Sequence, residues 1–410
     1  MLGPITFLLL INDLPSHVNS PSRLFADDTS LIFTHPPTEN ITDLVNSEIV
    51  RLKQWADTWL VSLNTSKTKC LHVHSSRSSI VPSPVFDGDP IEVVQNHKHL
   101  GVVLNSSLTW GDHINYIIGK VSKRIGILRL LKSKLNRSSL RSIYITHIRS
   151  ILEYCDVLWD GCTVGQALEL EQLQNECLRI VTGLPRFCST DKLLVESGFE
   201  RLSDRRRHHR LTLLYKSLFR NECPPYFLAL LPPLRSDSTA RNNRNLNTFY
   251  LPPSRTATYS NSFIPKTLRD WNSLDTDVRC APSISLFKRL IHPPLVPTAP
   301  IIESPRFVSI IYTKLKNECS SLNSHLHRVN LIPSPLCACG TGVEDNFHYF
   351  FNCPYYDVQR FRLMDELDYL GLSVFSIPTI LSWNLHLDPN ILFAIQSCVY
   401  KFILDTRRFC

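Results

Sequence analysis

The sequence predicts an α+β fold, in which a region of short strands and helices precedes a longer, mainly helical part and a small Cys/His-rich module. Short apolar runs bounded by turn residues are mixed with helical spacing over residues 1–104, and helical spacing dominates afterwards. Four Cys and His residues then cluster within residues 337–353. The 410 residues, 43% of them hydrophobic and 20% charged, are enough for two or three hydrophobic cores.

Over residues 1–104, the pattern predicts two short strands, then a helix, then two more strands. Residues 24–26 and 31–33 are apolar runs, with Asp27 and Asp28 at or near the turn between them. Two further strands are expected around residues 70–74 and 100–104. The helix between them has apolar residues at three- and four-residue spacing, namely Ile41, Val45, Ile49, Leu52, Trp55 and Trp59.

A basic helical region follows. Helical spacing of apolar residues runs over residues 114–135, 166–180 and 205–218. The chain has 44 Lys and Arg against 36 Asp and Glu, and its net charge of +8 favours acidic partners such as nucleic acid. Residues 120–149 contain nine Lys or Arg and no Asp or Glu, so positive charge is concentrated there.

Proline content sets apart the next segment. Residues 224–300 hold 12 of the 27 prolines, several in adjacent pairs that cannot continue helices or central strands. We therefore expect a linker or loosely folded connector there. Helical spacing returns around residues 307–326 and 356–370. The expected parts of the chain are residues 1–104, 105–223, 224–300 and 301–410.

Cysteine usage favours a reducing, intracellular environment. The 13 Cys are odd in number and mostly lie singly, unlike those of a disulfide-rich secreted domain. Residues 5–11 are apolar like the core of a signal peptide, but no basic segment precedes them and Asn12 and Asp13 follow. No other stretch approaches the roughly 18 uncharged apolar residues of a membrane span. We expect a nuclear or cytoplasmic protein that is not secreted and has no membrane partner.

The adjacent acids Asp27 and Asp28 are the strongest indication of catalysis. Two neighbouring carboxylates repel each other unless a cation neutralises them, and a divalent-metal site for phosphoryl transfer supplies that cation. The alternative is a surface turn, because Asp-Asp pairs are frequent in turns.

Five segments in order support the catalytic interpretation. In this order and spacing they resemble the later palm motifs of reverse transcriptases from non-LTR (LINE-type) retrotransposons. The resemblance continues through Trp110 and His113 into the basic helices, and more loosely through residues 271–274 to the C-terminal Cys/His cluster. The five segments are residues 2–14 (LGPITFLLLINDL), residues 23–29 (RLFADDT), Trp55 with Trp59, residues 63–68 (LNTSKT) and residues 99–102 (HLGV).

The resemblance implies part of a reverse-transcriptase palm followed by a helical thumb, acting with an RNA template, a DNA primer, dNTP and catalytic Mg²⁺. Asp27 would be the metal ligand and Asp28 the supporting carboxylate. Lys67 matches a lysine that assists the pyrophosphate leaving group, and a solvated loop charge is the alternative. Lys98 and Gly101 belong to the hairpin that would hold the primer end, where a plain strand core is the alternative.

One part of the family's active site has no counterpart. Two-metal polymerisation needs a further aspartate, on an earlier strand, that bridges both ions. In the family this aspartate and the fingers lie many residues before the Leu-Gly-Pro segment, whereas here Met1 directly precedes Leu2. We therefore expect a truncated palm without measurable polymerase activity from this chain alone, and no endonuclease domain. A wrongly assigned start of the chain or a degenerate genomic copy would explain this start equally well.

Lys120, Lys123, Arg124, Lys132 and Lys134 are the candidate phosphate-binding residues of the thumb. They lie mostly off the apolar stripe and could neutralise the phosphates of a duplex. Nothing in the pattern indicates base reading, so binding should depend on charge, shape and salt. The alternatives are a solvated helix face for these residues and, for the protein, a non-catalytic nucleic-acid-binding function.

The last candidate site comprises Cys337, Cys339, His348 and Cys353. Thiolates and an imidazole close together favour a structural, tetrahedral Zn²⁺ with all four positions closed by protein. The Cys-x-Cys spacing and the long loop before His348 depart from the common zinc knuckle, although similar clusters end many LINE-type reverse transcriptases. Buried thiols without a metal are the alternative.

Overall fold

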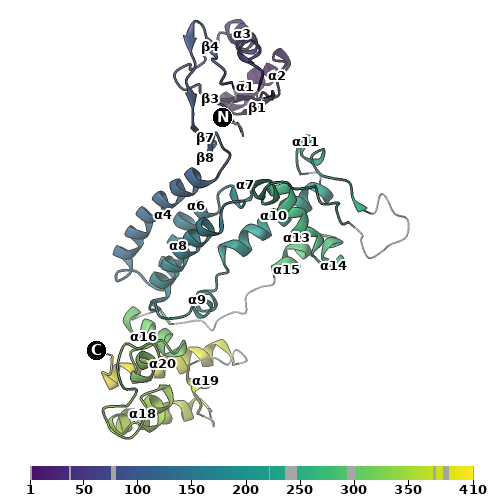
Figure 1. Cartoon of the computed structure of the whole chain (residues 1–410). Helices are drawn as coiled ribbons and strands as arrows, with labels where there is room; N and C mark the ends of the chain where they lie inside the picture. The colour runs from purple at the N-terminus through teal and green to yellow at the C-terminus, as the bar shows by residue number, and fades with distance from the viewer. Residues whose placement is uncertain are drawn as a thin grey trace. The chain divides into compact units, whose positions relative to one another are not determined.

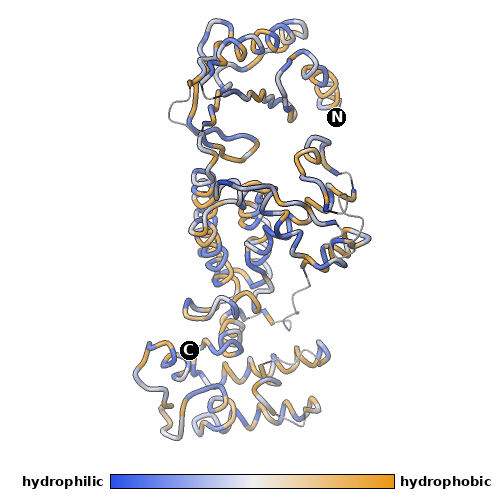
Figure 2. Tube along the Cα trace, turned by 45° about the vertical axis from the view of Figure 1, so that its right-hand side comes forward, coloured by the Kyte–Doolittle hydropathy of each residue, from blue (hydrophilic) through white to orange (hydrophobic). Residues whose placement is uncertain are grey.

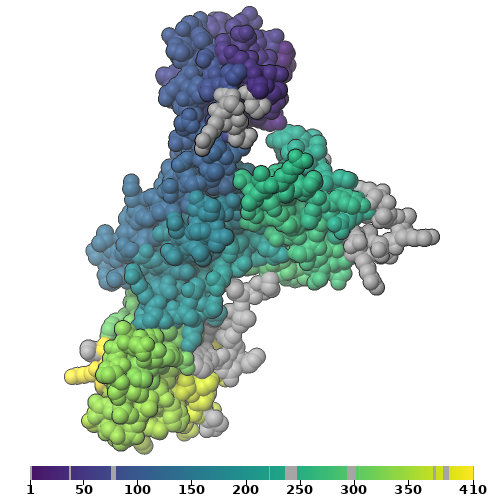
Figure 3. Space-filling view, in the orientation of Figure 1, coloured from purple at the N-terminus to yellow at the C-terminus, as the bar shows by residue number. Residues whose placement is uncertain are grey.

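A computed structural model describes the chain except residues 1, 37, 75–79, 221, 236–246, 293–301, 304, 373–374, 382–386 and 410. The chain divides into two compact units, Met1–Tyr116 and Ile117–Cys410, and each is described by itself. Figure 1 labels their helices and strands, and Figure 3 shows the same view with all atoms drawn. The combination of helices with small sheets agrees with the α+β class expected from the sequence.

The described part of the first unit contains two-stranded sheets. The pairs β1–β2, β4–β5 and β7–β8 are antiparallel, and β3–β6 is parallel. The pairing brings the two acids, Asp27 and Asp28, to the end of the β1–β2 hairpin. The strands are β1 (Ser22–Phe25), β2 (Asp28–Leu31), β3 (Cys70–Leu71), β4 (Val85–Phe86), β5 (Asp89–Pro90), β6 (Val93–Val94), β7 (Asn96–His99) and β8 (Val102–Asn105).

The helix expected between the strand pairs of this unit is present as α3. Its apolar stripe buries Val45, Ile49 and Trp55, as the three- and four-residue spacing requires. The Trp55 indole N–H donates a hydrogen bond to the Asp13 carboxylate at 2.8 Å, which joins α3 to the chain just before α2. The helices of this unit are α1 (Leu2–Ile11), α2 (Leu14–His17) and α3 (Thr42–Thr58).

Helices make up most of the second unit, and its first part confirms the helical regions expected from spacing. Val121, Ile125 and Leu128 of α4 are fully buried, while charged residues occupy the other positions of the helix. Along the helices in Figure 2, hydrophobic and hydrophilic residues are interleaved, as in amphipathic helices. These elements are α4 (Gly111–Leu131, in this unit from residue 117), α5 (Arg137–Ile143), η1 (Tyr144–Arg149), α6 (Ser150–Leu152), α7 (Asp156–Trp159), α8 (Val164–Thr182), α9 (Thr190–Ser197) and α10 (Leu202–Phe219).

Residues 247–292 differ from the connector that their proline content suggested, because they fold into short helices on α10. Trp271 and Phe287 are fully buried against residues of α10 in one hydrophobic core. Pro265 does not prevent this, since it lies in the first turn of α13, where backbone N–H groups lack helical partners anyway. The helices after α10 are α11 (Pro225–Leu228), α12 (Ala257–Ser260), α13 (Phe263–Asn272), α14 (Thr276–Arg279) and α15 (Ile284–Ile291).

The C-terminal part has its own core, in which α16, α18 and α20 pack together. Tyr312, Phe350 and Val399 are fully buried there. Among the described residues, no helix combines the length and apolar character needed to cross a membrane. The elements are α16 (Arg306–Lys316), α17 (Asn323–His327), η4 (His348–Asn352), η5 (Pro354–Tyr356), α18 (Asp357–Tyr369), α19 (Ile377–Ile380) and α20 (Pro389–Thr406).

Candidate functional site

The paired acids lie at the tip of the β1–β2 hairpin. Phe25 pairs with Asp28, so Ala26 and Asp27 form the two-residue turn between the strands. Ala26 has a φ of 51°, in the left-handed region that tight hairpin turns use. Both carboxylates are exposed, and neither has a hydrogen bond or ion pair within the described residues. A cation could therefore reach them without displacing a protein partner.

The hairpin by itself does not make a complete metal site. Across the described ranges, Asp27 and Asp28 belong to no cluster of three or more side chains able to hold a metal ion. Mg²⁺ bound there would take its remaining ligands from water and from phosphate oxygens, which are the ligands it prefers beside one or two carboxylates. The pair can hold or attract a cation, but the bridging of two ions needs another carboxylate.

Lys67 lies in a polar turn of the same unit. Its backbone N–H donates to the Asn64 side-chain oxygen at 3.0 Å, and the Thr68 N–H donates to the Asn64 carbonyl at 3.1 Å. The Lys67 amino group is exposed and has no partner in the described part of the chain. Both the leaving-group role and the solvated loop charge are compatible with this position.

The segment around Gly101 forms the hairpin between β7 and β8. His99 pairs with Val102, and Leu100 and Gly101 have φ values of 46° and 86°, as a two-residue turn with two left-handed positions requires. The strand expected from residue 100 begins at Val102 because the two preceding residues form this turn. Lys98 is exposed, with its Nζ atom 5.0 Å from the centroid of the Tyr116 ring, a cation–π contact.

The basic candidates of the thumb-like part occupy α4 and the turn after it. Lys120, Lys123, Lys132 and Lys134 are exposed, whereas Arg124 is half-buried and donates to a backbone carbonyl of η1. The apolar stripe of α4 faces inward, as the spacing indicated. Four of the five candidates are therefore accessible to a phosphate backbone.

Acids from elsewhere neutralise part of the acid-free segment 120–149. Three of its arginines form ion pairs with glutamates outside the segment, so they are not free to bind phosphates. Lys123, Lys132 and Lys134 have no ion pair within the described residues. The surface available to nucleic acid is thus narrower than the sequence suggested. The neutralised pairs are Arg129–Glu176, Arg137–Glu196 and Arg149–Glu153.

The basic run at the start of α10, residues 205–210, contains arginines that pair with an acid inside the second unit. Arg206 and Arg210 are buried, and each donates to the Asp160 carboxylate at 2.7 Å. Lys266 also reaches Asp160, at 2.8 Å. Burial alone would raise the pKa of Asp160, but Arg210, Lys266 and Arg206 outweigh that effect and hold the pKa below its ordinary value. This run therefore contributes to the core of the second unit.

The four C-terminal ligand candidates converge. Their ligand atoms all lie within 4.8 Å of one another, and Cys337, His348 and Cys353 are buried. The Sγ atoms of Cys337 and Cys353 are 3.8 Å apart, which matches the edge of about 3.8 Å between two thiolates around tetrahedral zinc. Cys339 Sγ lies 3.2 Å from Nε2 of His348. The Cys337 N–H donates to the Gly342 carbonyl at 2.9 Å and closes the turn that carries the first two thiols.

The thiols of this cluster have pKa values that a metal ion would change. Burial raises the pKa of Cys353 to about 12 and also raises the pKa of Cys337. The Thr341 hydroxyl hydrogen bond is the main reason why the pKa of Cys339 falls to about 6. A bound cation deprotonates thiols outright, so it would offset the desolvation of the two buried sulfurs. The residues present therefore fit a structural Zn²⁺ site.

Comparison with known proteins supports the resemblance to reverse transcriptases of non-LTR retrotransposons. The chain is 24% identical over 235 residues to "Probable RNA-directed DNA polymerase from transposon BS" of Drosophila melanogaster, which covers 52% of this chain and 26% of that protein. It is 26% identical over 197 residues to the corresponding polymerase from transposon X-element of the same species, covering 46% and 21%. The chain is related to the RNA-directed DNA polymerases of non-LTR retrotransposons. It spans about a quarter of the length of these relatives. No family model matches the chain.

A longer match extends over the part of this chain that contains the Cys/His cluster, Cys337 to Cys353. "Retrovirus-related Pol polyprotein from type-1 retrotransposable element R1" of Bradysia coprophila is 20% identical over 371 residues, covering 87% of this chain and 34% of that protein. The uncovered remainder is smaller than the 57 residues that follow Cys353. The matched segment therefore includes the region of Cys337 to Cys353 and the thumb-like part before it.

Proposed function

We propose that this chain carries the later palm and the thumb of an RNA-directed DNA polymerase from a non-LTR retrotransposon, followed by a zinc-stabilised C-terminal module. One observation carries the proposal: the Asp27–Asp28 hairpin and the ordered motifs around it occur in a chain related to such polymerases over about half its length. The partners are an RNA template, a DNA primer and dNTP, and the site of action is nuclear or cytoplasmic.

The proposed chemistry is phosphoryl transfer assisted by Mg²⁺. When bound, the ion would neutralise charge on the phosphate oxygens of the nucleotide. Asp27 would ligate it, Asp28 would support it from the first position of β2, and the Lys67 ammonium would stabilise the pyrophosphate leaving group. Lys98 and Gly101 would hold the primer end at the β7–β8 hairpin.

We also propose that the 410-residue polypeptide does not extend a primer by itself. Within the described chain, no third metal-ligating side chain lies beside Asp27 and Asp28. The second Mg²⁺ of a two-metal site would then be held poorly, and the activation barrier of nucleotide addition would be higher by several kcal/mol. A primer-extension assay on a primed RNA template with Mg²⁺ tests this. We expect no synthesis; Mg²⁺-dependent synthesis that Asp27→Ala abolishes would refute inactivity while establishing the polymerase.

A non-catalytic nucleic-acid-binding function is the second candidate, favoured by the exposed lysines without ion pairs. Replacing Lys123, Lys132 and Lys134 together by Gln should lower the affinity for primed template and reduce the salt slope by about 2–3, since each phosphate contact contributes about 0.7–0.9. Fluorescence anisotropy at several KCl concentrations measures both quantities. Equal slopes for wild type and variant would refute phosphate binding by these lysines.

The matched control for this experiment removes the same amount of charge elsewhere in the second unit. Lys192, Lys216 and Lys401 each already pair with a glutamate of the described chain. Replacing these three by Gln changes the net charge equally, but it should leave the salt slope near that of the wild type. A loss equal to that of the first variant would show that only net charge matters.

The zinc assignment is tested by metal analysis of purified protein. Wild type should contain zinc bound to the cluster, and Cys353→Ser should lose one equivalent, because the ion then retains only three of its four ligands. Cys280→Ser is the control, since Cys280 is exposed and lies outside the cluster. Equal zinc contents in wild type and Cys353→Ser would leave the cluster as buried thiols without a metal.

A further inference from the structure

A second set of metal-ligating side chains meets in the second unit, away from the Cys/His cluster. Glu200 lies between α9 and α10, His208 lies in α10, and His292 directly follows α15. Each offers one ligand atom, and these atoms all lie within 4.8 Å of one another. The two imidazole rings are 4.8 Å apart between centroids. Residues separated by 92 positions in the sequence are thus brought to one point by helix packing.

The distances have the size expected around a metal ion. Oε2 of Glu200 lies 3.3 Å from Nδ1 of His208 and 3.2 Å from Nδ1 of His292. Nitrogen and oxygen ligands at 2.0–2.1 Å from tetrahedral zinc lie about 3.3–3.4 Å apart, so both separations are close to an edge of that tetrahedron. The three atoms could therefore contact one ion with little rearrangement.

The hydrogen bonding of His208 favours an ion over a simple ion pair. Its Nδ1 atom is buried and has no hydrogen-bond partner, although Oε2 of Glu200 is only 3.3 Å away. The two atoms are thus close without the alignment that an N–H···O bond requires. A buried polar nitrogen without a partner is costly, and coordination of a cation would satisfy it.

The other oxygen of Glu200 is already occupied. Nη1 of Arg205 donates to Oε1 at 3.0 Å, and the rest of the Arg205 guanidinium is paired with the Glu153 carboxylate. This contact orients the Glu200 carboxylate and leaves Oε2 facing the two imidazoles, as an outer-shell partner of a metal ligand does. Arg205 therefore does not compete for the position between Oε2 and the rings.

We propose that Glu200, His208 and His292 bind a divalent transition-metal ion, with Zn²⁺ as the natural occupant. Two imidazoles and one carboxylate suit zinc better than Mg²⁺ or Ca²⁺, which prefer oxygen ligands. The His292 side chain is 39% exposed, so water can complete the coordination. The ion would clamp the beginning of α10 to the end of α15 and stabilise the packing of residues 247–292.

The test counts metal in the full-length chain and identifies its ligands with Co²⁺. Thiolate ligands give cobalt an intense charge-transfer absorption, whereas imidazole and carboxylate ligands give only weak bands. With both clusters loaded, wild type should bind about two Co²⁺ per chain. His292→Ala should bind about one, with the thiolate absorption unchanged. If the Cys/His cluster holds no metal, wild type should bind one and His292→Ala none, both without that absorption.

The controls separate loss of ligands from loss of folding. His147→Ala removes an exposed imidazole outside the cluster and should bind as much Co²⁺ as wild type. Glu200→Gln keeps a side chain of similar shape and should weaken Co²⁺ binding at this site at least tenfold. Circular dichroism should be unchanged in each variant. Equal binding by wild type, His292→Ala and Glu200→Gln would overturn the proposal.

Discussion

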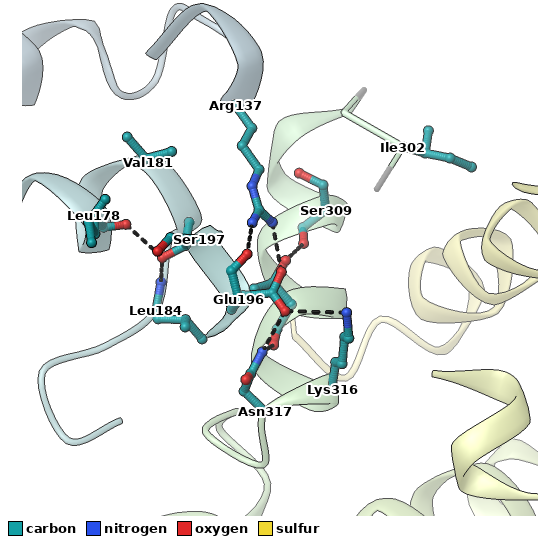
Figure 4. A network of polar contacts seen from close by, with 12 residues as sticks. Arg137, Leu178, Val181, Leu184, Glu196, Ser197, Ile302, Ser309, Lys316 and Asn317 are labelled. Carbon is teal, nitrogen blue, oxygen red and sulfur yellow. Dashed lines mark hydrogen bonds and ion pairs between the residues drawn. The ribbon is translucent and has the colours of Figure 1, made fainter. Parts of the chain in front are cut away.

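The carboxylate of Glu196 offers a quantitative test of how α9 and α16 are held together. Figure 4 shows it between Arg137 on one side and Lys316 with Asn317 on the other. Its oxygens lie 2.9 Å from Nη1 of Arg137, 3.3 Å from Nζ of Lys316 and 3.2 Å from Nδ2 of Asn317. The Glu196 side chain is only 2% exposed, so these charges interact in a poorly screened environment.

Removing that charge should destabilise the second unit strongly. Glu196→Gln deprives the side chains of Arg137 and Lys316, which are only 14% and 11% exposed, of their shared carboxylate. Breaking a buried pair in this way costs about 3–5 kcal/mol, which is more than a hundredfold in the unfolding equilibrium. Hydrogen exchange of the α9 and α16 amides, with urea denaturation, measures the loss. A change within about 0.5 kcal/mol of wild type would refute the reasoning.

Two further variants locate the source of this effect. Glu318→Gln removes a nearby carboxylate whose pair with Lys192 is about 40% exposed, so it should cost less than about 1 kcal/mol. Replacing Glu196 by Leu together with Arg137→Met and Lys316→Met should recover most of the stability, because an apolar set no longer leaves a buried charge unpaired. If that triple variant were as unstable as Glu196→Gln, unpaired charge would not be the cause.

Three other outcomes follow from local geometry. Gly183→Ala should lower the free energy of unfolding by about 1–3 kcal/mol more than Gly198→Ala. Both positions have positive φ, but only a Cβ at position 183 would meet Ile310, at 2.6 Å. Equal urea midpoints of the two variants would contradict this. Burial lowers the pKa of His325 to about 4, so as the pH falls the unfolded chain binds a proton at this imidazole before the folded chain does. The free energy of unfolding should therefore fall by roughly 3 kcal/mol as the pH drops from about 6.5 to 4. His325→Gln should remove that slope in urea denaturation at several pH values, and an unchanged slope would exclude His325 as its source. EDTA should lower the melting temperature of wild type by more than that of Cys353→Ser, which keeps only the Glu200, His208 and His292 cluster; equal shifts would argue against the Cys/His cluster.

Long helices could be predicted from the sequence because their signal is local. The apolar spacing that predicted α3, α8, α10 and α18 depends on residues three and four positions apart, and it gave the existence of each helix. The bounds of the second strand were predicted less accurately. It was expected at residues 31–33, whereas β2 begins at Asp28 and ends at Leu31, so Asp28 lies in the strand and residues 32–33 do not. Boundaries of short strands depend on which residues pair, and spacing does not contain that information.

The charge and proline content of a segment predicted its structure less well, because the contacts that fix these segments are not local. The start of α10 carries the basic run of residues 205–210, yet Arg206 and Arg210 bind Asp160, which lies 46 and 50 positions earlier. Likewise, Pro265 lies in the first turn of α13, Pro282 directly precedes the N-cap residue of α15, and the buried Trp271 supplies the core. In both cases the contact that determines the structure is made with residues far away in the sequence: Asp160 for the two arginines, and residues of α10 for Trp271. Composition alone does not contain that information.

The two metal-ligating clusters show the same distinction at the level of function. Cys337, Cys339, His348 and Cys353 lie within 17 residues, so their spacing alone indicated a site, whereas Glu200, His208 and His292 meet only through the packing of α10 and α15. A site on a short loop must obtain much of its order from the ion, and binding and folding are then coupled. A site on packed helices is positioned before any ion arrives, because buried apolar residues already hold its ligands in place. Loss of metal should therefore unfold the first site and only loosen the second.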